Sequence, residues 1–242
     1  MNGLKFLVTG GSGKLGSVLC SYLDCVAPKS SEMNILDAGQ IESVVKKQKF
    51  DAIFHLAAYT NQKLADKEKS KCYETNVIGT RNVVSVAKKY SLKVFYISTD
   101  YVFPCTSGNY SETDIPSPVN WYGFTKYAGE LEVQNATNNY CIIRTSFRPI
   151  KWDFPTAYSN VFTSADYVDV IANELKLCLD LNLSGIIHIG TAKKSLYELA
   201  KIRNPDVTPQ VCTDTAVPKL RDLNISRWLN EKKARISEEA DI

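Results

Sequence analysis

Histidines and closely spaced cysteines, the residues behind much metal and nucleophile chemistry, are scarce in this sequence. Its 242 residues include two histidines, His55 and His188, and each lies in an apolar run of the kind that forms a buried strand. We therefore expect both to be hydrogen-bonded core residues rather than bases or metal ligands. The seven cysteines contain no C-x-x-C pair, so we predict neither a disulfide framework nor a metal site.

Long apolar runs and a strong net charge are also missing. No run approaches the roughly 20 residues that a membrane-spanning helix requires, and the apolar stretch Leu4–Val8 is too short for a signal peptide. Lys and Arg total 29 against 26 for Asp and Glu, a balance that predicts neither a nucleic-acid nor a membrane-surface partner. We expect a globular cytoplasmic protein.

Short apolar strands alternate with amphipathic helical stretches along the chain, a pattern typical of a parallel sheet covered by helices. The strand candidates are Leu4–Thr9, Ala52–Leu56, Val94–Ser98, Cys141–Arg144 and Ile186–Ile189. The helix candidates are Lys14–Leu23, Ala38–Gln48, Ala65–Tyr90, Tyr122–Gln134, Ala165–Leu179 and Ser195–Ile202. The near-continuous apolar strands indicate burial on both faces, so we predict an α/β fold with a Rossmann-type doubly wound parallel sheet.

The alternation weakens after about residue 145, which indicates a boundary. We predict a dinucleotide-binding domain over residues 1–146 and a small, shortened substrate-binding region over residues 147–242, partly interleaved with the sheet. The stretch Pro104–Pro118 is expected to be a long loop, and loops of this length in compact domains are often functional.

The first strand is followed directly by a glycine-rich loop. Gly10, Gly13 and Gly16 are spaced G-x-x-G-x-x-G between this strand and the first helix. Glycines at such positions allow a tight turn and let the backbone approach a pyrophosphate, whose charge the helix N-terminus stabilises. We interpret the loop as a dinucleotide-binding site.

The segment that discriminates between NAD and NADP contains no acidic residue. An acid about 20 residues after the last glycine normally binds the ribose of NAD, whereas Cys25–Ser31 occupies this zone. Lys29, Ser30 and Ser31 suit a 2′-phosphate, so we favour NADP, with NAD as the alternative. Asp37 follows this zone and either contacts the adenine or caps the helix that begins near Ala38.

A tyrosine and a lysine four residues apart provide the candidate acid–base pair. Three Y-x-x-x-K matches occur, at Tyr59/Lys63, Tyr122/Lys126 and Tyr197/Lys201. Only the second opens a helix after the long loop, and its spacing places both side chains on one helix face. A free phenol has a pKa near 10 and a nearby ammonium lowers it, so we predict that Tyr122 is a general acid.

Several segments together resemble a known superfamily. They are Thr9–Gly16, His55–Thr60, Ser98–Pro104, Asn120–Lys126 and Arg144–Ser146. In this set the chain resembles the extended short-chain dehydrogenase/reductase superfamily and, within it, the dTDP-4-dehydrorhamnose reductase family of sugar-nucleotide-binding proteins. The resemblance is dense from residue 4 to about residue 148 and thinner beyond, and S-T-D-Y-V-F at Ser98–Phe103 is its most discriminating part.

The resemblance implies a set of site residues. Thr99, Tyr122 and Lys126 would be the catalytic triad, and the substrate would contact Thr99, Asp100, Tyr101 and Phe147. The cofactor would contact Gly10, Ser12, Gly13, Lys14, Leu15, Asp37, Ala57, Ala58, Tyr59, Asn76, Ser98, Tyr122, Lys126 and Thr145. The implied reaction is delivery of hydride from a reduced nicotinamide to C4 of a nucleotide-linked 4-keto-6-deoxy sugar, with Tyr122 donating the proton.

The residues that follow Thr99 separate related activities. The 4,6-dehydratases of the superfamily carry Asp-Glu at this place, whereas Asp100-Tyr101 stands here, which favours reduction over dehydration. The alternatives are another nucleotide-sugar epimerase or reductase, and a regulatory subunit that binds a dinucleotide without turnover. The resemblance also suggests a homodimer paired through the long helices Ala65–Tyr90 and Tyr122–Gln134.

The chain departs from the family most clearly just after Ser146, where it is short. The aromatic and basic segment Phe147–Pro155 takes the place of the missing length. We expect this segment either to contact a nucleotide or diphosphate through Arg148 or Lys151, or to be a packed loop.

Overall fold

A six-stranded parallel sheet forms the centre of the protein. The computed structural model describes residues 4–240. The strands are β1 (Phe6–Thr9), β2 (Cys25–Val26), β3 (Ala52–His55), β4 (Lys93–Thr99), β5 (Tyr140–Thr145) and β10 (Gly185–His188). Their order in the sheet is β10-β5-β4-β3-β1-β2, and every neighbouring pair is parallel. The order therefore reverses between β1 and β3, and the predicted doubly wound sheet is confirmed.

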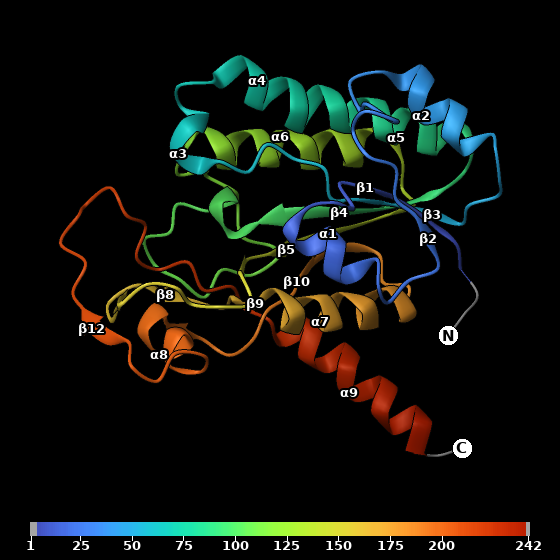
Figure 1. Ribbon diagram of the computed structural model, residues 1–242. Coiled ribbons are helices and arrows are strands. Elements are labelled where there is room, and N and C mark those ends of the chain that lie inside the picture. The colour runs from blue at the N-terminus through green and yellow to red at the C-terminus, as the bar shows by residue number, and fades with distance from the viewer. Residues whose placement is uncertain (1–3, 241–242) are drawn as a thin grey trace.

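Helices cover both faces of this sheet (Figure 1). On one face lie α2 (Ala38–Val45), α5 (Gly79–Lys89) and α6 (Trp121–Ala136), and on the other lie α1 (Lys14–Leu19) and α7 (Val168–Asp180). Successive residues of a strand point to opposite faces. Ile53 accordingly packs in the core under α2 and α5, while its neighbour Phe54 packs in the core against α7. Both faces of the central strands are buried, as the apolar runs indicated.

The expected single helix Ala65–Tyr90 is interrupted. It consists of α4 (Lys69–Tyr73), a π-helical segment (Glu74–Ile78) and α5, while Ala65 ends the short α3 (Gln62–Ala65). The amides of Lys67 and Glu68 donate to the Leu64 carbonyl and close a turn between α3 and α4. Because neither glycine nor proline marks this turn, the sequence pattern predicted one helix.

Two further differences come from contacts between distant parts of the chain. Helix α7 begins at Val168 rather than Ala165, because β9 (Asp166–Tyr167) pairs with β6 (Phe147–Arg148). Helix α9 (Ser226–Ala240), which the sequence patterns did not predict, buries Trp228 completely, and the indole donates to Glu174 of α7 at 2.5 Å. Across residues 4–240, no helix combines the length and apolar character needed to traverse a lipid bilayer.

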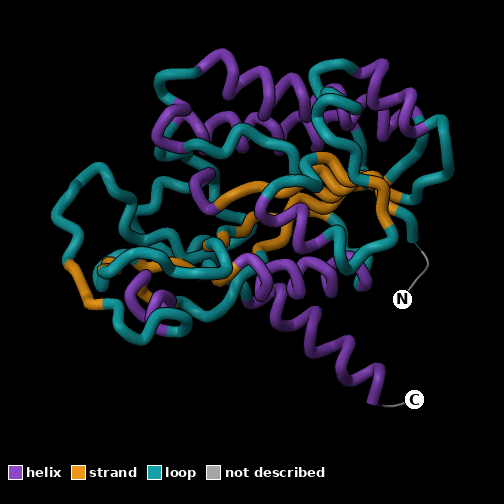
Figure 2. The backbone as a smooth tube through the Cα atoms, viewed as in Figure 1, coloured by secondary structure: helices purple, strands orange, loops and turns teal. Residues whose placement is uncertain are grey.

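Short elements beyond β5 form a smaller lobe at one end of the sheet, on the left in Figure 2. Three two-stranded ladders pair β6 with β9, β7 (Thr156–Tyr158) with β12 (Thr208–Gln210), and β8 (Phe162–Thr163) with β11 (Lys194–Ser195), which precedes α8 (Leu196–Lys201). The same part of the chain also supplies α7 and β10 to the main sheet. The lobe is thus interleaved with the sheet rather than appended to it.

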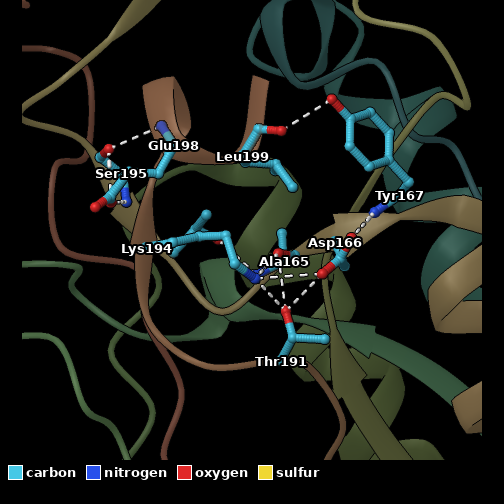
Figure 3. A network of polar contacts seen from close by, with 9 residues as sticks. Ala165, Asp166, Tyr167, Thr191, Lys194, Ser195, Glu198 and Leu199 are labelled. Carbon is cyan, nitrogen blue, oxygen red and sulfur yellow. Dashed lines mark hydrogen bonds and ion pairs between the residues drawn. The ribbon is translucent and has the colours of Figure 1, made fainter. Parts of the chain in front are cut away.

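A partly buried polar network holds this lobe together (Figure 3). The Lys194 ammonium lies 3.2 Å from the Asp166 carboxylate and also donates to the Thr191 hydroxyl, which itself donates to Asp166 at 2.9 Å. The adjacent Tyr167 hydroxyl donates to the Leu199 carbonyl at 3.0 Å. Because β9 carries Asp166 and Tyr167, the network fixes β9 and, through the ladder, β6.

Both histidines are buried core residues, as predicted. His55 is hydrogen-bonded through its two ring nitrogens to the hydroxyls of Thr9 at 2.6 Å and Thr80 at 3.0 Å. His188 is fully buried, and its Nδ1 lies 3.1 Å from the Tyr110 carbonyl oxygen. Burial lowers the pKa of each imidazole to about 3, with a smaller contribution from a nearby cation, Lys126 for His55 and Arg144 for His188.

These imidazoles are expected to destabilise the fold in mild acid. Between pH 6.5 and pH 3 the unfolded state binds protons that the folded state does not, so stability falls as the pH drops. Each histidine contributes a loss of about 2 kcal/mol between pH 7 and pH 5. Urea unfolding of wild type and His188→Gln at both pH values measures this, because glutamine cannot titrate there. An equal pH-dependent loss in both proteins would contradict the assignment for His188.

Candidate active site

The glycine-rich loop lies between β1 and α1, beside the point where the strand order reverses. A methyl group on Gly16 would lie 2.3 Å from the Gly10 carbonyl oxygen, and one on Gly10, where φ is +74°, would lie 2.6 Å from the Ala57 amide nitrogen. Only glycine therefore allows so tight a loop. Its tip, residues 12–14, is exposed, whereas the Leu15 side chain packs in the core. No side chain caps α1, so amide groups of its first turn can bind a phosphate.

The strand β2, at the edge of the sheet next to this loop, has only two residues. Residues 29–31 are exposed beyond it, and the Glu32 carboxylate accepts a hydrogen bond from the Lys29 amide at 2.8 Å. Asp37 accepts hydrogen bonds of 2.9 and 3.2 Å from two amides at the start of α2. Of the two roles open for Asp37, the structure therefore supports the helix cap rather than the adenine contact.

The buried Asn76 links the segment that follows β3 to α6 through hydrogen bonds. The Asn76 amide oxygen accepts from the Tyr59 backbone amide at 2.7 Å, and its nitrogen donates to the Tyr59 carbonyl at 3.2 Å and the Thr125 hydroxyl at 3.0 Å. Ala57, Ala58 and Tyr59 are half-buried beside the loop. Asn76 was expected to contact the cofactor, but these bonds make it a residue that positions the segment 57–59.

Thr99, Tyr122 and Lys126 lie together where β4 ends and α6 begins. Thr99 is the last residue of β4, and Tyr122 and Lys126 are one turn apart on α6, which Asn120 caps by accepting from the Gly123 amide at 2.8 Å. All three side chains are buried, with exposed fractions of 5%, 8% and 3%. The Thr99 hydroxyl lies near the Tyr122 phenol and opposes the rise in its pKa, and the Lys126 ammonium lies 4.0 Å from the centre of the Tyr96 ring.

Burial shifts the pKa values of this pair in opposite directions. It raises the pKa of Tyr122 above its usual value, and the nearby Asp100 carboxylate raises it further. Burial also lowers the pKa of Lys126 to about 7, against the effect of Glu130, so Lys126 carries its charge only part of the time at neutral pH. The expected lowering of the Tyr122 pKa is therefore wrong, because desolvation and the Asp100 carboxylate raise it. The phenol remains protonated at neutral pH, which is the form that donates a proton.

A buried ion pair between α6 and β5, which the sequence analysis missed, lies next to the site. Glu130 and Arg144 are about 99% buried and joined by two hydrogen bonds, of 3.0 Å from Nε and 2.7 Å from Nη2. Ser98, which was expected to contact the cofactor, donates to the same carboxylate at 2.5 Å. Tyr122, Lys126 and Glu130 follow one another at intervals of four along α6. This spacing is the signal from which Glu130 was recognisable.

The residues expected to bind the substrate lie next to the triad. The Tyr101 ring packs edge-on against Tyr122, with ring centres 6.3 Å apart. The buried Asp100 accepts from the Thr99 hydroxyl at 2.9 Å through Oδ1, while its Oδ2 has no hydrogen-bond partner among residues 4–240. The half-buried Phe147 packs against the core around α7, so a packing role accounts for it.

Thr145 and Arg221 also lie near the triad and Tyr101. Thr145 ends β5 opposite Thr99, and its buried hydroxyl has no hydrogen-bond partner in the described part of the chain. Arg221 donates to the Tyr101 hydroxyl at 2.9 Å, although 120 residues separate the two in sequence. Lys151, a predicted diphosphate contact, is exposed. The structure therefore brings a threonine, a protonated phenol, a lysine and an arginine together at the carboxyl edge of the sheet.

Comparison with known proteins gives a consistent picture. The sequence model described as the RmlD substrate binding domain matches residues 4–176. A dTDP-4-dehydrorhamnose reductase from Aggregatibacter actinomycetemcomitans is 31% identical in an alignment of 186 residues, and the match covers 71% of this chain and 61% of the relative. Methionine adenosyltransferase 2 subunit beta from Xenopus tropicalis is 28% identical in an alignment of 155 residues, and the match covers 59% of this chain and 46% of that protein. The chain thus spans about half to three fifths of the length of these relatives.

A solved structure is similar along nearly the whole chain. It is the dTDP-4-dehydrorhamnose reductase from Bacillus anthracis in complex with NADP, with a TM-score of 0.82 and 27% identity. The match covers 97% of this chain and 98% of that chain. The arrangement of the sheet and the smaller lobe is therefore shared with that protein.

Proposed function

Because the chain belongs to the family of the RmlD substrate binding domain, we propose that it is an NADPH-dependent reductase of a nucleotide-linked 4-keto-6-deoxy sugar. The reaction adds a hydride to the C4 carbonyl carbon and a proton to its oxygen, which gives an alcohol. The supporting observation is the convergence of Thr99, Tyr122 and Lys126 in one buried cluster at the same edge of the sheet as the glycine-rich loop.

The residues at the carboxyl edge of the sheet suit this cofactor. The exposed tip of the loop and the first turn of α1 would hold the pyrophosphate through backbone amides. The absence of an acid among residues 25–31 leaves room for the charge of a 2′-phosphate. NADPH, when bound, supplies the hydride. The similar structure from Bacillus anthracis contains NADP, which favours this cofactor over NAD.

The protein's own residues would donate the proton and orient the carbonyl group. The Thr99 hydroxyl, which donates to the Asp100 carboxylate at 2.9 Å, would turn this hydrogen bond to the carbonyl oxygen and orient it. Tyr122, whose pKa burial and Asp100 raise, would deliver its proton to the same oxygen. Transfer leaves a phenolate, which the positive charge of Lys126 on the same helix face favours. Asn76 would keep the segment 57–59 and α6 at a fixed distance.

The similarity to methionine adenosyltransferase 2 subunit beta supports a second candidate, a dinucleotide-binding subunit that acts on a partner enzyme. The two candidates differ in turnover. A subunit without catalytic activity needs no buried Tyr–Lys pair, and burying a lysine without an ion pair is costly, so the intact cluster favours the reductase.

Loss of NADPH absorbance tests the proposal. Purified protein is mixed with NADPH or NADH and a panel of dTDP-, UDP- and GDP-linked 4-keto-6-deoxy sugars. We expect substrate-dependent oxidation of NADPH with one nucleotide series, and slower or no oxidation of NADH. Tight NADPH binding without turnover on any sugar would exclude the reductase and favour the regulatory subunit.

A further inference from the structure

The ammonium group of Lys126 is buried without a hydrogen-bonding partner. The residue is 3% exposed, and within the described part of the chain its Nζ takes part in no hydrogen bond or ion pair. The acid one turn further along α6, Glu130, is already bonded to Arg144 and Ser98. A buried ammonium that lacks a partner is unfavourable, so the side chain that faces it decides how well the charge is tolerated.

That side chain is Tyr96. It lies on β4, on the face of the sheet that α6 covers (Figure 1), and the Lys126 ammonium is 4.0 Å from the centre of its ring. The face of an aromatic ring carries a partial negative charge and attracts a cation within about 6 Å, most strongly where water is excluded. Because Tyr96 is fully buried, the ring stabilises the charged form of Lys126.

The fold fixes the ring of Tyr96 in this position. Its hydroxyl donates to the Lys126 carbonyl at 3.2 Å. A methyl group on Gly129 would lie 2.2 Å from the same hydroxyl oxygen, so glycine is required for the ring to come this close to α6. On β3, the paired residue His55 packs against the ring, with ring centres 5.6 Å apart. The contact with the ammonium therefore belongs to the packed core and needs no ligand to form.

The titratable groups that face Lys126 in the described chain carry no positive charge at neutral pH. His55 on β3 has a pKa of about 3 and is neutral. Burial raises the pKa of the Cys72 thiol on α4 and of the Tyr122 phenol on α6, so both are neutral as well. Glu130 favours the ammonium but is held in its own ion pair. The ring of Tyr96 thus faces a single cation.

We propose that Tyr96 is a positioning residue for the reductase, whose aromatic face holds the Lys126 ammonium charged and in place one turn from Tyr122. The inference rests on the proposed function, in which the charge of Lys126 favours the phenolate left after proton transfer. Tyr96 acts through Lys126 rather than on the substrate. Weakening the ring's attraction is therefore expected to change the pH at which the enzyme works.

Fluorination of the ring tests the proposal, because it withdraws the negative charge from the aromatic face and nearly keeps the shape of the ring. The two proteins compared are Tyr96→Phe and one with pentafluorophenylalanine in place of Tyr96. The NMR resonance of the Lys126 Cε atom, assigned by its loss in Lys126→Met, gives the pKa of the ammonium. We expect the fluorinated ring to lower this pKa by about 1 relative to Tyr96→Phe.

Phe54 provides the matched control. It is as completely buried as Tyr96 but lies on the other face of the sheet, against α7. Pentafluorophenylalanine at Phe54 is therefore expected to leave the pKa of Lys126 unchanged. The proposal is overturned if the pKa of Lys126 is the same in Tyr96→Phe and in its fluorinated counterpart, or if fluorination at both positions lowers it equally.

Circular dichroism checks that each protein is folded. If pentafluorophenylalanine is not accommodated in place of Tyr96, a monofluorinated phenylalanine carries the test, because it changes the size of the ring less. It is expected to lower the pKa of Lys126 in the same direction by a smaller amount. No decrease relative to Tyr96→Phe would overturn the proposal.

The pH dependence of sugar-nucleotide reduction gives a second readout. Because Lys126 acts in its charged form, kcat/KM is expected to fall as the pH rises through its pKa, and with the fluorinated ring this fall begins at a pH lower by about 1. At pH 7, near the pKa of about 7 for Lys126, the expected loss is about fivefold. A loss of the same size at every pH would contradict the role of Tyr96.

The two proposals fail separately, since the NMR titration requires neither substrate nor cofactor. A lowered pKa of Lys126 without turnover on any sugar supports the contact with Tyr96 and excludes the reductase. Turnover together with an unchanged pKa supports the reductase and overturns the role of Tyr96.

Discussion

Replacing Tyr122 with phenylalanine is expected to lower kcat for sugar-nucleotide reduction by about 10²- to 10⁴-fold, the contribution typical of a positioned general acid. The phenol is the buried proton donor next to Thr99, and its pKa is raised, so it is protonated at neutral pH. Phenylalanine keeps the ring and its edge-on packing against Tyr101. The affinity for NADPH, measured by fluorescence titration, is expected to remain within a few-fold of wild type.

The chain offers a matched control for this substitution. Tyr197 and Lys201 have the same spacing on α8, outside the cluster, and Tyr197→Phe is expected to leave kcat unchanged. A decrease of less than tenfold in Tyr122→Phe would show that the proton comes from elsewhere. An equal decrease in both variants would show that the effect is not specific to the cluster.

The second large effect is expected from Glu130→Gln, which removes the negative charge that compensates buried Arg144. Breaking one partner of a buried ion pair typically destabilises a protein by about 3 to 5 kcal/mol. Here both side chains are about 99% buried, and the same carboxylate also accepts from Ser98. The free energy of unfolding in urea at pH 7 measures the loss.

The double variant Glu130→Gln with Arg144→Met shows whether the loss comes from the unpaired charge. Removing both charges is expected to recover much of the stability, because replacing a whole buried pair is often nearly neutral. Arg81 and Glu132, an exposed pair with side chains 52% and 23% exposed, provide the control. Glu132→Gln is expected to cost less than about 1 kcal/mol. Equal losses for Glu130→Gln and Glu132→Gln would contradict the role of burial.

Much of the fold was predictable because its signals are local. Strands buried on both faces appear as short apolar runs, and five of the six strands of the sheet were recognisable in this way. The two-residue β2 was not, because an edge strand of that length has no pattern of its own. The starts of α1 at Lys14 and of α8, which follows the capping box of Ser195 and Glu198, depend on neighbouring residues, so the starts of these two helices were predictable.

The Tyr122–Lys126 pair was also predictable, because one turn of helix places these two residues, whereas Thr99 was assigned through the family resemblance. The sign of the Tyr122 pKa shift was not predictable. It depends on how completely the surrounding chain excludes water, and Asp100, Tyr101 and Cys72 all contribute to it. A spacing of four residues fixes the distance between two side chains but not their solvation.

The amino-acid sequence by itself determined the parallel α/β fold, the glycine-rich loop and the Tyr122–Lys126 pair, because each is encoded by residues within a few positions of one another. Only the tertiary structure decided that Glu130 pairs with Arg144, that Trp228 of α9 packs beneath the sheet, and that Arg221 reaches Tyr101 across 120 residues of chain. Such contacts depend on how distant segments pack together. The same packing excludes water from the site and so determines the pKa values of its buried groups.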